Sequence, residues 1–188
     1  MDILIINSSP NNDGLTSACA QAALEGIVQA GGEAKEVCLN DLSIGSCKAC
    51  DNGWGTCRDE HYCKVLDDFQ ALHERMLKAD AFVFVTPVYW GDLSESMKNF
   101  TDRLRRCEAL KGEESGFKQK PVMMIAAAGG SGNGMITCLA QLERWIDHVH
   151  ARKWDFIPVN RWSRGYKLET IRAAAEAMTS TAGNPSAG

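Results

Sequence analysis

The sequence predicts an α/β fold in which helices cover both faces of a doubly wound, five-stranded parallel sheet with the strand order 2-1-3-4-5. Five strand-like runs alternate with five stretches of helical periodicity, the pattern of a parallel sheet with crossover helices. Residues 3–6, 81–86 and 121–128 are continuous apolar runs, as expected of central strands that are buried on both sides. Residues 33–39 are more polar, which suits strand 2 at the edge of this order.

The bulk properties are those of a single globular domain, which we expect to span residues 1–178. A chain of 188 residues is long enough for a full core, and 45% apolar with 23% charged residues is ordinary for such a domain. The formal net charge is −4 and no basic block stands out, which argues against nucleic-acid binding.

The sequence also bears on the compartment. The N-terminus enters a strand directly, without the basic start and apolar core of a signal peptide. No stretch approaches the ~20 apolar residues that span a bilayer, so we expect no membrane association and a cytoplasmic protein. Eight cysteines in that compartment indicate metal binding, redox chemistry or core packing rather than a disulfide scaffold.

A small polar loop follows the first strand and leads into a helix over residues 15–30. A helix N-terminus in this place offers unpaired N–H groups and a positive dipole end to an anion, and Ser9, Thr16 and Ser17 add hydroxyl donors. The loop has neither a Walker A nor a G-x-G-x-x-G pattern, so it suits a single terminal phosphate. The alternative is an ordinary polar turn with a helix cap.

The periodic signal stops over residues 41–64, where we expect an insertion in the fold. Connections of this length are usually functional or covered by a partner. Helical spacing resumes over residues 65–79. The insertion holds half of the cysteines of the chain: Cys47, Cys50, Cys57 and Cys63.

A strand, an aromatic loop and a helix make up residues 81–106. Asp92 followed by Glu95 predicts a helix N-cap and its capping partner. Tyr89 and Trp90 stand between strand and helix, where open parallel sheets bind ligands. Alternatively, the two rings simply plug the end of the sheet.

The last elements complete the alternation. The loop 129–134 has four glycines in six residues, which lets the backbone approach a flat group closely. Residues 179–188 are small and polar, and we expect a disordered tail there. The expected elements are a strand over 121–128, a helix over 135–149, a strand over 154–159 and a helix over 168–178.

Three of the loops meet at one end of the predicted sheet, because in this strand order the loops after strands 1, 3 and 4 all open at the carboxyl ends of the strands. One loop suits a phosphate, one offers aromatic rings and one allows close backbone approach. Together they fit a planar cofactor with a phosphate tail better than any of them does alone.

Several motifs resemble those of the NAD(P)H-dependent FMN reductase family. They are Ser8-Ser9-Pro10 with Gly14-x-Thr16, the run Thr86-Pro87-Val88-Tyr89-Trp90-Gly91 with Lys98 and Asp102-Arg103 downstream, and the Gly-rich loop. The resemblance extends from residue 1 to about residue 159. It implies a flavodoxin-like fold, noncovalently bound FMN and a homodimer or homotetramer.

The resemblance also implies a set of FMN-binding residues. Many relatives have Arg in place of Asn11 and Asn in place of Leu15, so one charged phosphate contact is missing here. Ser9, Asn11, Gly14, Thr16 and Ser17 would form the phosphate loop; Pro87, Val88, Tyr89, Trp90 and Gly91 would lie along the isoalloxazine; Gly129, Gly130 and Gly134 would contact the ring or ribityl from the other side.

The cysteine spacing in the insertion, C-x2-C-x6-C-x5-C, resembles that of the iron-sulfur flavoprotein branch of the family. That branch carries a [4Fe-4S] cluster on four cysteines, with a tighter C-x2-C-x2-C start. Four thiolates this close suit an iron-sulfur or zinc site at Cys47, Cys50, Cys57 and Cys63. The alternative is a loop of reduced cysteines that binds nothing.

The other polar and sulfur-containing residues have simpler interpretations. His61 lies in the insertion and could join a metal site. We expect the other histidines at surface or capping positions, three arginines on the solvated face of their helix, and the remaining cysteines in the core. These residues are His73, His148 and His150; Arg103, Arg105 and Arg106; and Cys19, Cys38, Cys107 and Cys138.

The function expected from these observations is an FMN-dependent oxidoreductase that takes a hydride from NADPH or NADH and reduces a second acceptor, such as a flavin or a quinone. No catalytic acid or base is needed, because the cofactor carries the chemistry. The alternative is an electron-transfer flavoprotein that passes electrons between partner proteins, with or without an iron-sulfur cluster. A binding module that has lost its flavin is disfavoured by the three intact loops. The exposed aromatic residues expected at residues 53–55 and 89–90 predict a homo-oligomer.

Overall fold

The computed structural model describes residues 1–182, and its five strands form one parallel sheet in the order β2-β1-β3-β4-β5. The predicted fold class and strand order are therefore confirmed. The strands are β1 (Asp2–Asn7), β2 (Glu33–Cys38), β3 (Ala81–Pro87), β4 (Pro121–Ala128) and β5 (Arg152–Asn160).

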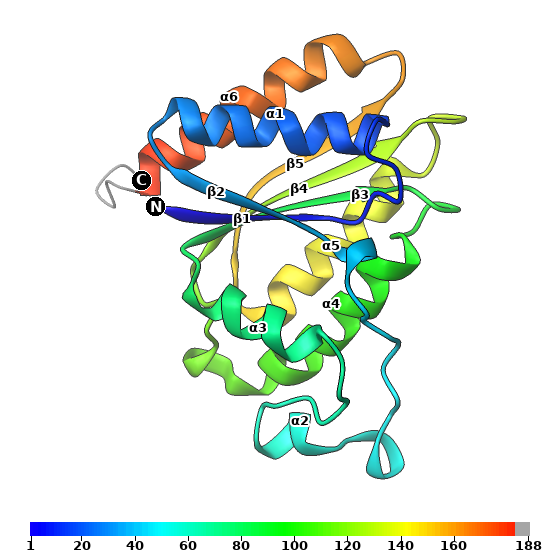
Figure 1. The fold of residues 1–188 in the computed structure, drawn as a ribbon, viewed down its shortest axis with the longest axis vertical. Helices are drawn as coiled ribbons and strands as arrows, with labels where there is room; N and C mark the ends of the chain where they lie inside the picture. The colour runs from blue at the N-terminus through cyan, green and yellow to red at the C-terminus, as the bar shows by residue number, and fades with distance from the viewer. Residues whose placement is uncertain (183–188) are drawn as a thin grey trace.

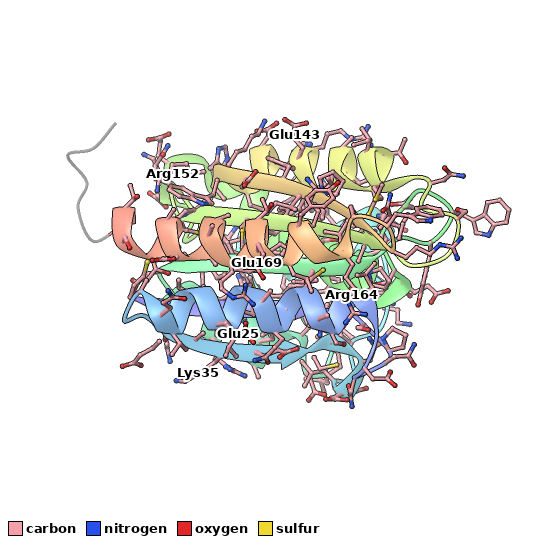
Figure 2. All side chains as sticks on the ribbon, turned by 90° about the horizontal axis from the view of Figure 1, so that it is seen from above. Glu25, Lys35, Glu143, Arg152, Arg164 and Glu169 are labelled. Carbon is pink, nitrogen blue, oxygen red and sulfur yellow. The ribbon has the colours of Figure 1, made fainter. Side chains whose placement is uncertain are left out.

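Helices cover the two faces of the sheet unequally (Figure 1). Helices α1 (Leu15–Gln29) and α6 (Arg164–Ala182) lie side by side on one face (Figure 2). Arg172 of α6 donates hydrogen bonds to Glu25 of α1 and to Glu169. The opposite face carries α3 (Phe69–Lys78), α4 (Glu95–Glu108) and α5 (Met135–Val149). The three layers of the prediction are thus present.

The central strands bury both of their faces. In β1, Ile3 and Ile5 belong to the core under α1 and α6, while Leu4 and Ile6 belong to the core under α3, α4 and α5. This is the alternation that a strand imposes on successive side chains. The two cores hold the sheet rigid, so the loops at its carboxyl end start from fixed positions.

The residues between β2 and α3 form the predicted insertion, which extends below the helical layer (Figure 1). It contains the short helix α2 (Thr56–Asp59) and the 3₁₀ turns η1 (Leu39–Asp41) and η2 (Asp51–Gly53). Helix α3 begins at Phe69 rather than at residue 65 as predicted. The preceding Asp67 and Asp68 instead accept hydrogen bonds from the backbone of Gly45 and Ser43.

The last two elements also differ from the prediction: β5 spans residues 152–160 rather than 154–159, and α6 begins at Arg164 rather than at residue 168. Helix α6 runs from Arg164 to Ala182, so the expected tail is helical over 179–182, where Thr179 is buried; residues 183–188 lie outside the described part of the chain. A further 3₁₀ turn, η3 (Ala109–Glu114), follows α4. Among the described residues, no helix is long and apolar enough to cross a membrane.

The cap of α4 is Ser94 and not Asp92, which corrects the predicted capping pair. The Ser94 hydroxyl accepts from the Met97 backbone N–H at 3.4 Å and donates to the Ser8 hydroxyl at 2.9 Å. The Asp92 carboxylate instead accepts from the neighbouring N–H of Leu93 at 2.7 Å. Ser94 thereby ties the start of α4 to the loop after β1.

Candidate functional site

The loops after β1, β3 and β4 lie at the same end of the sheet, as the parallel order requires (Figure 1). Two of them are joined directly to the sheet. The Ser8 N–H donates to the Val85 carbonyl at 3.0 Å, and the Val88 N–H donates to the Ala127 carbonyl at 3.0 Å. The structure therefore brings together the three segments that the sequence assigned to one site.

The hydroxyls of the first loop are already engaged. Ser9 and Ser17 both donate to the backbone carbonyl of Asn11, at 2.7 and 2.5 Å. Ser9 also accepts from the Asn11 N–H at 3.3 Å. These two residues, expected to donate to a phosphate, hold the loop in shape in this structure, and their donors would have to leave Asn11 to reach a ligand.

The start of α1 still offers donors to an anion. Its N-cap is Gly14, which has no side chain to satisfy the first N–H groups, and its first turn carries no acidic residue. Thr16 is 5% exposed, and within residues 1–182 its hydroxyl makes no hydrogen bond. An unpaired helix start with a hydroxyl at its second position is a fitting place for a phosphate.

A neighbouring cleft is less suitable for that phosphate. It has a volume of about 430 Å³ and lies between the first loop and the end of β2. Asp13 and Glu36 line it, and two carboxylates repel an anion.

The loops after β3 and β4 are locked to each other through two glycines. A Cβ added to Gly134 would lie 2.5 Å from the Cα of Gly91, a distance that no other residue could tolerate. Both glycines also have positive φ, at 81° for Gly91 and 79° for Gly134. The Thr137 hydroxyl donates to the Gly91 carbonyl at 2.7 Å and completes the lock.

A cleft of about 570 Å³ opens between these two loops. Such a volume is within the range of small-molecule and cofactor sites. Its lining residues have no titratable side chain: Val88, Trp90, Gly91, Ala128, Gly129, Gly130, Ser131, Asn133, Gly134 and Thr137. A Cβ added to Gly129 or Gly130 would meet no atom within 4 Å, so bare backbone faces open space there.

The aromatic pair after β3 does not plug the sheet, so that alternative is wrong. Tyr89 and Asp92 exchange backbone hydrogen bonds of 3.0 and 2.9 Å across a tight turn. Trp90 lies at the tip of this turn with φ of 52° and is fully exposed, while Tyr89 is 40% exposed. Pro87 ends β3 opposite Ala127 and is half-buried.

The residues present fit FMN. The unsatisfied N–H groups of α1 suit its phosphate, and the glycine-lined cleft suits its flat ring, because any side chain at Gly129 or Gly130 would enter that space. Ser8, Ser94 and Thr137, which support the loops, were not predicted as site residues. Ser8 stands in the Ser8-Ser9-Pro10 motif, but the sequence pattern gave none of the three its supporting role, since each contacts a partner far along the chain.

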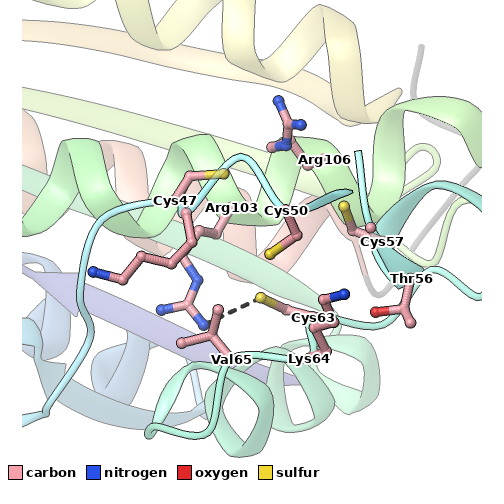
Figure 3. A pocket seen from close by; sticks show the side chains of 11 residues that line it. Cys47, Cys50, Thr56, Cys57, Cys63, Lys64, Val65, Arg103 and Arg106 are labelled. Atoms are coloured by element: carbon pink, nitrogen blue, oxygen red, sulfur yellow. Dashed lines mark hydrogen bonds between the residues drawn. The ribbon is translucent and has the colours of Figure 1, made fainter. Parts of the chain in front are cut away.

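The four cysteines of the insertion line one pocket, together with Arg103 and Arg106 of α4 (Figure 3). All four are free and half-buried. Within residues 1–182, however, no three His, Cys, Asp or Glu side chains are placed closely enough to hold a metal ion. The donor set has the chemistry of an iron-sulfur or zinc site, but as the chain lies here its geometry does not fit one.

Trp54, expected among the exposed aromatic residues, is half-buried and contacts α4. The Arg106 guanidinium lies 4.2 Å from the centre of its ring. His61 is half-buried but does not line the pocket of the cysteines. The sequence therefore predicted which cysteines line the pocket, but not the contacts with α4 that hold the insertion in place.

Two interpretations of charged residues were wrong. Arg103 is 2% exposed rather than solvated, because Asp67 pairs with its guanidinium. His73 is 1% exposed rather than at the surface, with its Nε2 2.7 Å from the Glu108 carboxylate. Burial opposes ionisation of Glu108, but hydrogen bonds from His73 and Lys111 outweigh it and lower the Glu108 pKa to about 2.

The remaining expectations for histidine and cysteine hold with one exception. His148 is exposed and His150 caps α5 in a left-handed conformation. Burial raises the thiol pKa to about 12 in three core cysteines, Cys19, Cys107 and Cys138. Cys38 is only half-buried, so it is not a core residue.

Comparison with known proteins gives a family and a fold. The family model for NADPH-dependent FMN reductase matches residues 1–155. An iron-sulfur flavoprotein of Methanosarcina thermophila is 28% identical over 80% of this chain and 74% of its own length. Another, from Methanocaldococcus jannaschii, is 30% identical over 71% of this chain, and the match spans 65% of that relative.

Among solved structures, an NAD(P)H:quinone oxidoreductase from Methanothermobacter marburgensis superimposes with a TM-score of 0.73 at 18% identity, covering 95% of this chain and 96% of that one. At this identity the likeness concerns the fold, which is flavodoxin-like. The sheet order, the three loops at its carboxyl end and the match over residues 1–155 agree, and the chain belongs to the NADPH-dependent FMN reductase family.

Proposed function

We propose that this protein is an FMN-dependent oxidoreductase that takes a hydride from NADPH or NADH and reduces a second acceptor, such as a flavin or a quinone. The observation that carries the proposal is the cleft between the loops after β3 and β4, with its bare glycine backbone. The unpaired start of α1 at the same end of the sheet supports it. So does the family to which the chain belongs.

In this proposal FMN supplies the redox chemistry when it is bound. The first turn of α1 and the Thr16 hydroxyl hold the phosphate. The locked glycines Gly91 and Gly134 fix the width of the cleft, and the backbone at Gly129 and Gly130 lies against the ring. The cleft has no titratable lining, so the chain orients its ligands and donates no proton there.

The experiment is an anaerobic reduction of the FMN-loaded protein. We expect either NADPH or NADH to bleach the visible flavin absorbance rapidly, and an added quinone or free flavin to restore it. Exposed Val28 on α1 offers a control, Val28→Ala, which should leave both steps unchanged. A protein that binds FMN but is not reduced by either nucleotide would contradict the proposal.

A second candidate is an electron-transfer flavoprotein with an iron-sulfur cluster on the insertion. The observation that favours it is that Cys47, Cys50, Cys57 and Cys63 line a single pocket. The segment would have to close further before all four thiolates could reach one centre. In this candidate, electrons pass between partner proteins without turnover of a nicotinamide.

Anaerobic purification followed by iron, sulfide and zinc analysis tests the second candidate. We expect about four irons per chain with a matching amount of sulfide, both lost in Cys47→Ser and Cys57→Ser. About one zinc per chain instead would make the pocket a structural metal site and contradict this candidate, because zinc has no redox chemistry. Metal-free protein that still binds FMN and is reduced by a nicotinamide would leave the first candidate alone. The cytoplasmic location remains a prediction, which cell fractionation would test.

A further inference from the structure

One arginine of α4 is buried against the base of the insertion. Arg103 is 2% exposed, and its guanidinium lies 4.3 Å from the centre of the Phe69 ring. A charge buried in this way needs a partner. Asp67 supplies it through two parallel contacts, from Nη1 to Oδ2 at 2.5 Å and from Nη2 to Oδ1 at 2.9 Å.

The same two nitrogens also bind both ends of the insertion. Nη1 donates to the Gly45 carbonyl at 3.1 Å, and Nη2 donates to the Cys63 sulfur at 3.2 Å (Figure 3). Gly45 precedes the first cysteine of the pocket, and Cys63 is the last one. One guanidinium therefore joins the segment where it leaves the body of the protein and where it returns.

Neighbouring contacts reinforce this junction. The Gly45 N–H donates to Asp67 Oδ2 at 3.2 Å, and the Cys63 N–H donates to Gln70 Oε1 at 3.3 Å. Arg106 follows Arg103 by three residues and so lies on the same face of α4. It covers Trp54 in the middle of the insertion.

The four cysteines are not held alike. Among the described residues, Cys63 is the only cysteine of this pocket whose sulfur makes a hydrogen bond. Cys47, Cys50 and Cys57 line the pocket without one, on the part of the segment between the two anchored ends. One sulfur of the insertion is therefore fixed by a hydrogen bond, whereas the positions of the other three depend on the conformation of the loop.

We propose that Arg103 is a positioning residue that holds the insertion closed on α4 and fixes Cys63 as the anchored corner of the four-cysteine pocket. The planar fork of arginine can serve Asp67, Gly45 and Cys63 together, whereas the single ammonium of lysine cannot. The closure of the segment stands without any bound metal. Its consequence for metal affinity rests on the second candidate function above.

Hydrogen exchange of the full-length, metal-free protein tests the closure. In Arg103→Lys we expect amides of residues 45–63 to exchange about tenfold faster or more, because two hydrogen bonds from a charged donor are weakened. The matched control is Arg105→Lys on the same helix, since Arg105 lines a groove with α5 instead. FMN binding should be the same in both variants, which shows that the fold is intact.

A second variant tests the two ends of the insertion separately and leaves the buried ion pair of Arg103 and Asp67 intact. Cys63→Ala removes the sulfur acceptor but leaves Arg103 bound to Asp67 and Gly45. We expect faster exchange near residues 57–63, with residues 43–47 as protected as before. Unchanged exchange of residues 45–63 in both Arg103→Lys and Cys63→Ala would overturn the proposal.

Zinc binding measures the consequence for the pocket. Supporting residues of this kind typically contribute roughly 10–100-fold to metal affinity, so Arg103→Lys should weaken Zn²⁺ binding by that factor relative to Arg105→Lys. Equal zinc affinity in the two variants would overturn Cys63 as an anchored ligand. If the native protein binds neither zinc nor iron, the metal-binding candidate fails, and the exchange experiment alone decides on Arg103 as the residue that closes the segment.

Discussion

At the scale of single residues, the proposed FMN site depends on glycines that have no side chain. Gly14 leaves the start of α1 without a cap, and Gly129 and Gly130 leave backbone bare to the cleft. Gly91 and Gly134 allow two loops to touch. These glycines therefore act in different ways: some leave space for a ligand, and others allow two loops to pack closely. Substitutions at single positions distinguish the two roles.

Thr16→Ala should weaken FMN binding by about 1.5–3 kcal/mol, which is about tenfold or more in the dissociation constant, because a hydrogen bond to a charged phosphate is lost. Ser17→Ala is the control, since its hydroxyl donates to the Asn11 carbonyl. Fluorescence titration of apoprotein with FMN measures both constants. Unchanged constants in both Thr16→Ala and Ser9→Ala would place the phosphate elsewhere.

Gly134→Ala and Gly129→Ala should behave in opposite ways. The first forces a Cβ to within 2.5 Å of Gly91 and should destabilise the folded protein by about 1–3 kcal/mol. The second adds a methyl group to open space, so it should leave the unfolding midpoint unchanged and weaken FMN binding. Urea denaturation of the apoprotein and FMN titration would separate the two effects; a stable Gly134→Ala protein would argue against the lock.

At the scale of elements, α4 connects the two candidate sites. Ser94 at its start is bonded to the loop after β1, and Arg103 and Arg106 farther along contact the cysteine-rich insertion. With a rise of about 1.5 Å per residue, roughly 14 Å of helix separates Ser94 from Arg103. One helix therefore supports both the candidate FMN site and the cysteine pocket.

Ser94→Ala should destabilise the protein more than Asp92→Ala. The serine caps α4 and donates to Ser8, and loss of a helix cap alone costs about 1 kcal/mol. Asp92 accepts only from the adjacent Leu93 N–H, so its loss should be smaller. Urea unfolding measures the stability of both variants. A larger loss of stability in Asp92→Ala than in Ser94→Ala would indicate that Asp92 caps α4, as the sequence predicted.

Acid should destabilise the packing of α3 on α4 through Glu108. Its pKa is lowered to about 2, so the ionised carboxylate stabilises the folded state above its ordinary pKa of 4.5, and this contribution is lost as the pH falls towards 2. The size is on the order of 3 kcal/mol. The free energy of unfolding, measured across this pH range, should fall less steeply with decreasing pH in Glu108→Gln than in the native protein. The exposed control Glu114→Gln should show the same pH dependence as the native protein.

At the scale of the whole molecule, apolar surface is left exposed at the carboxyl end of the sheet. Trp90 is fully exposed, and Trp162 and Tyr166 are each 64% exposed. A Cβ on Gly132 of the Gly-rich loop would lie 2.6 Å from the Trp162 ring, so Trp162 borders that loop. Large exposed aromatic residues beside a cleft often mark an interface.

We expect a homodimer or homotetramer in solution, partly held together by Trp90. Light scattering should give a mass that is a multiple of 20.5 kDa, and Trp90→Ser should lower it. Val28→Ser replaces another exposed apolar side chain, at the C-terminal end of α1 and about 20 Å of helix from the loop after β1, and should leave the mass unchanged. A native protein that remains a 20.5 kDa monomer at micromolar concentration would contradict this prediction.

The sequence by itself determined the strand order, the loops that meet at the carboxyl end of the sheet, and the segment that holds the cysteines. Those features follow from local periodicity and from the rules of parallel sheets. Only the tertiary structure decided that Ser94 donates to Ser8, 86 residues away, and that Arg103 and His73 are buried. Their partners lie far along the chain: Asp67 is 36 residues from Arg103, and Glu108 is 35 residues from His73. From local sequence a charged residue is expected at the solvent-exposed surface. Whether it is buried depends on a counter-charge that only the packed chain brings next to it.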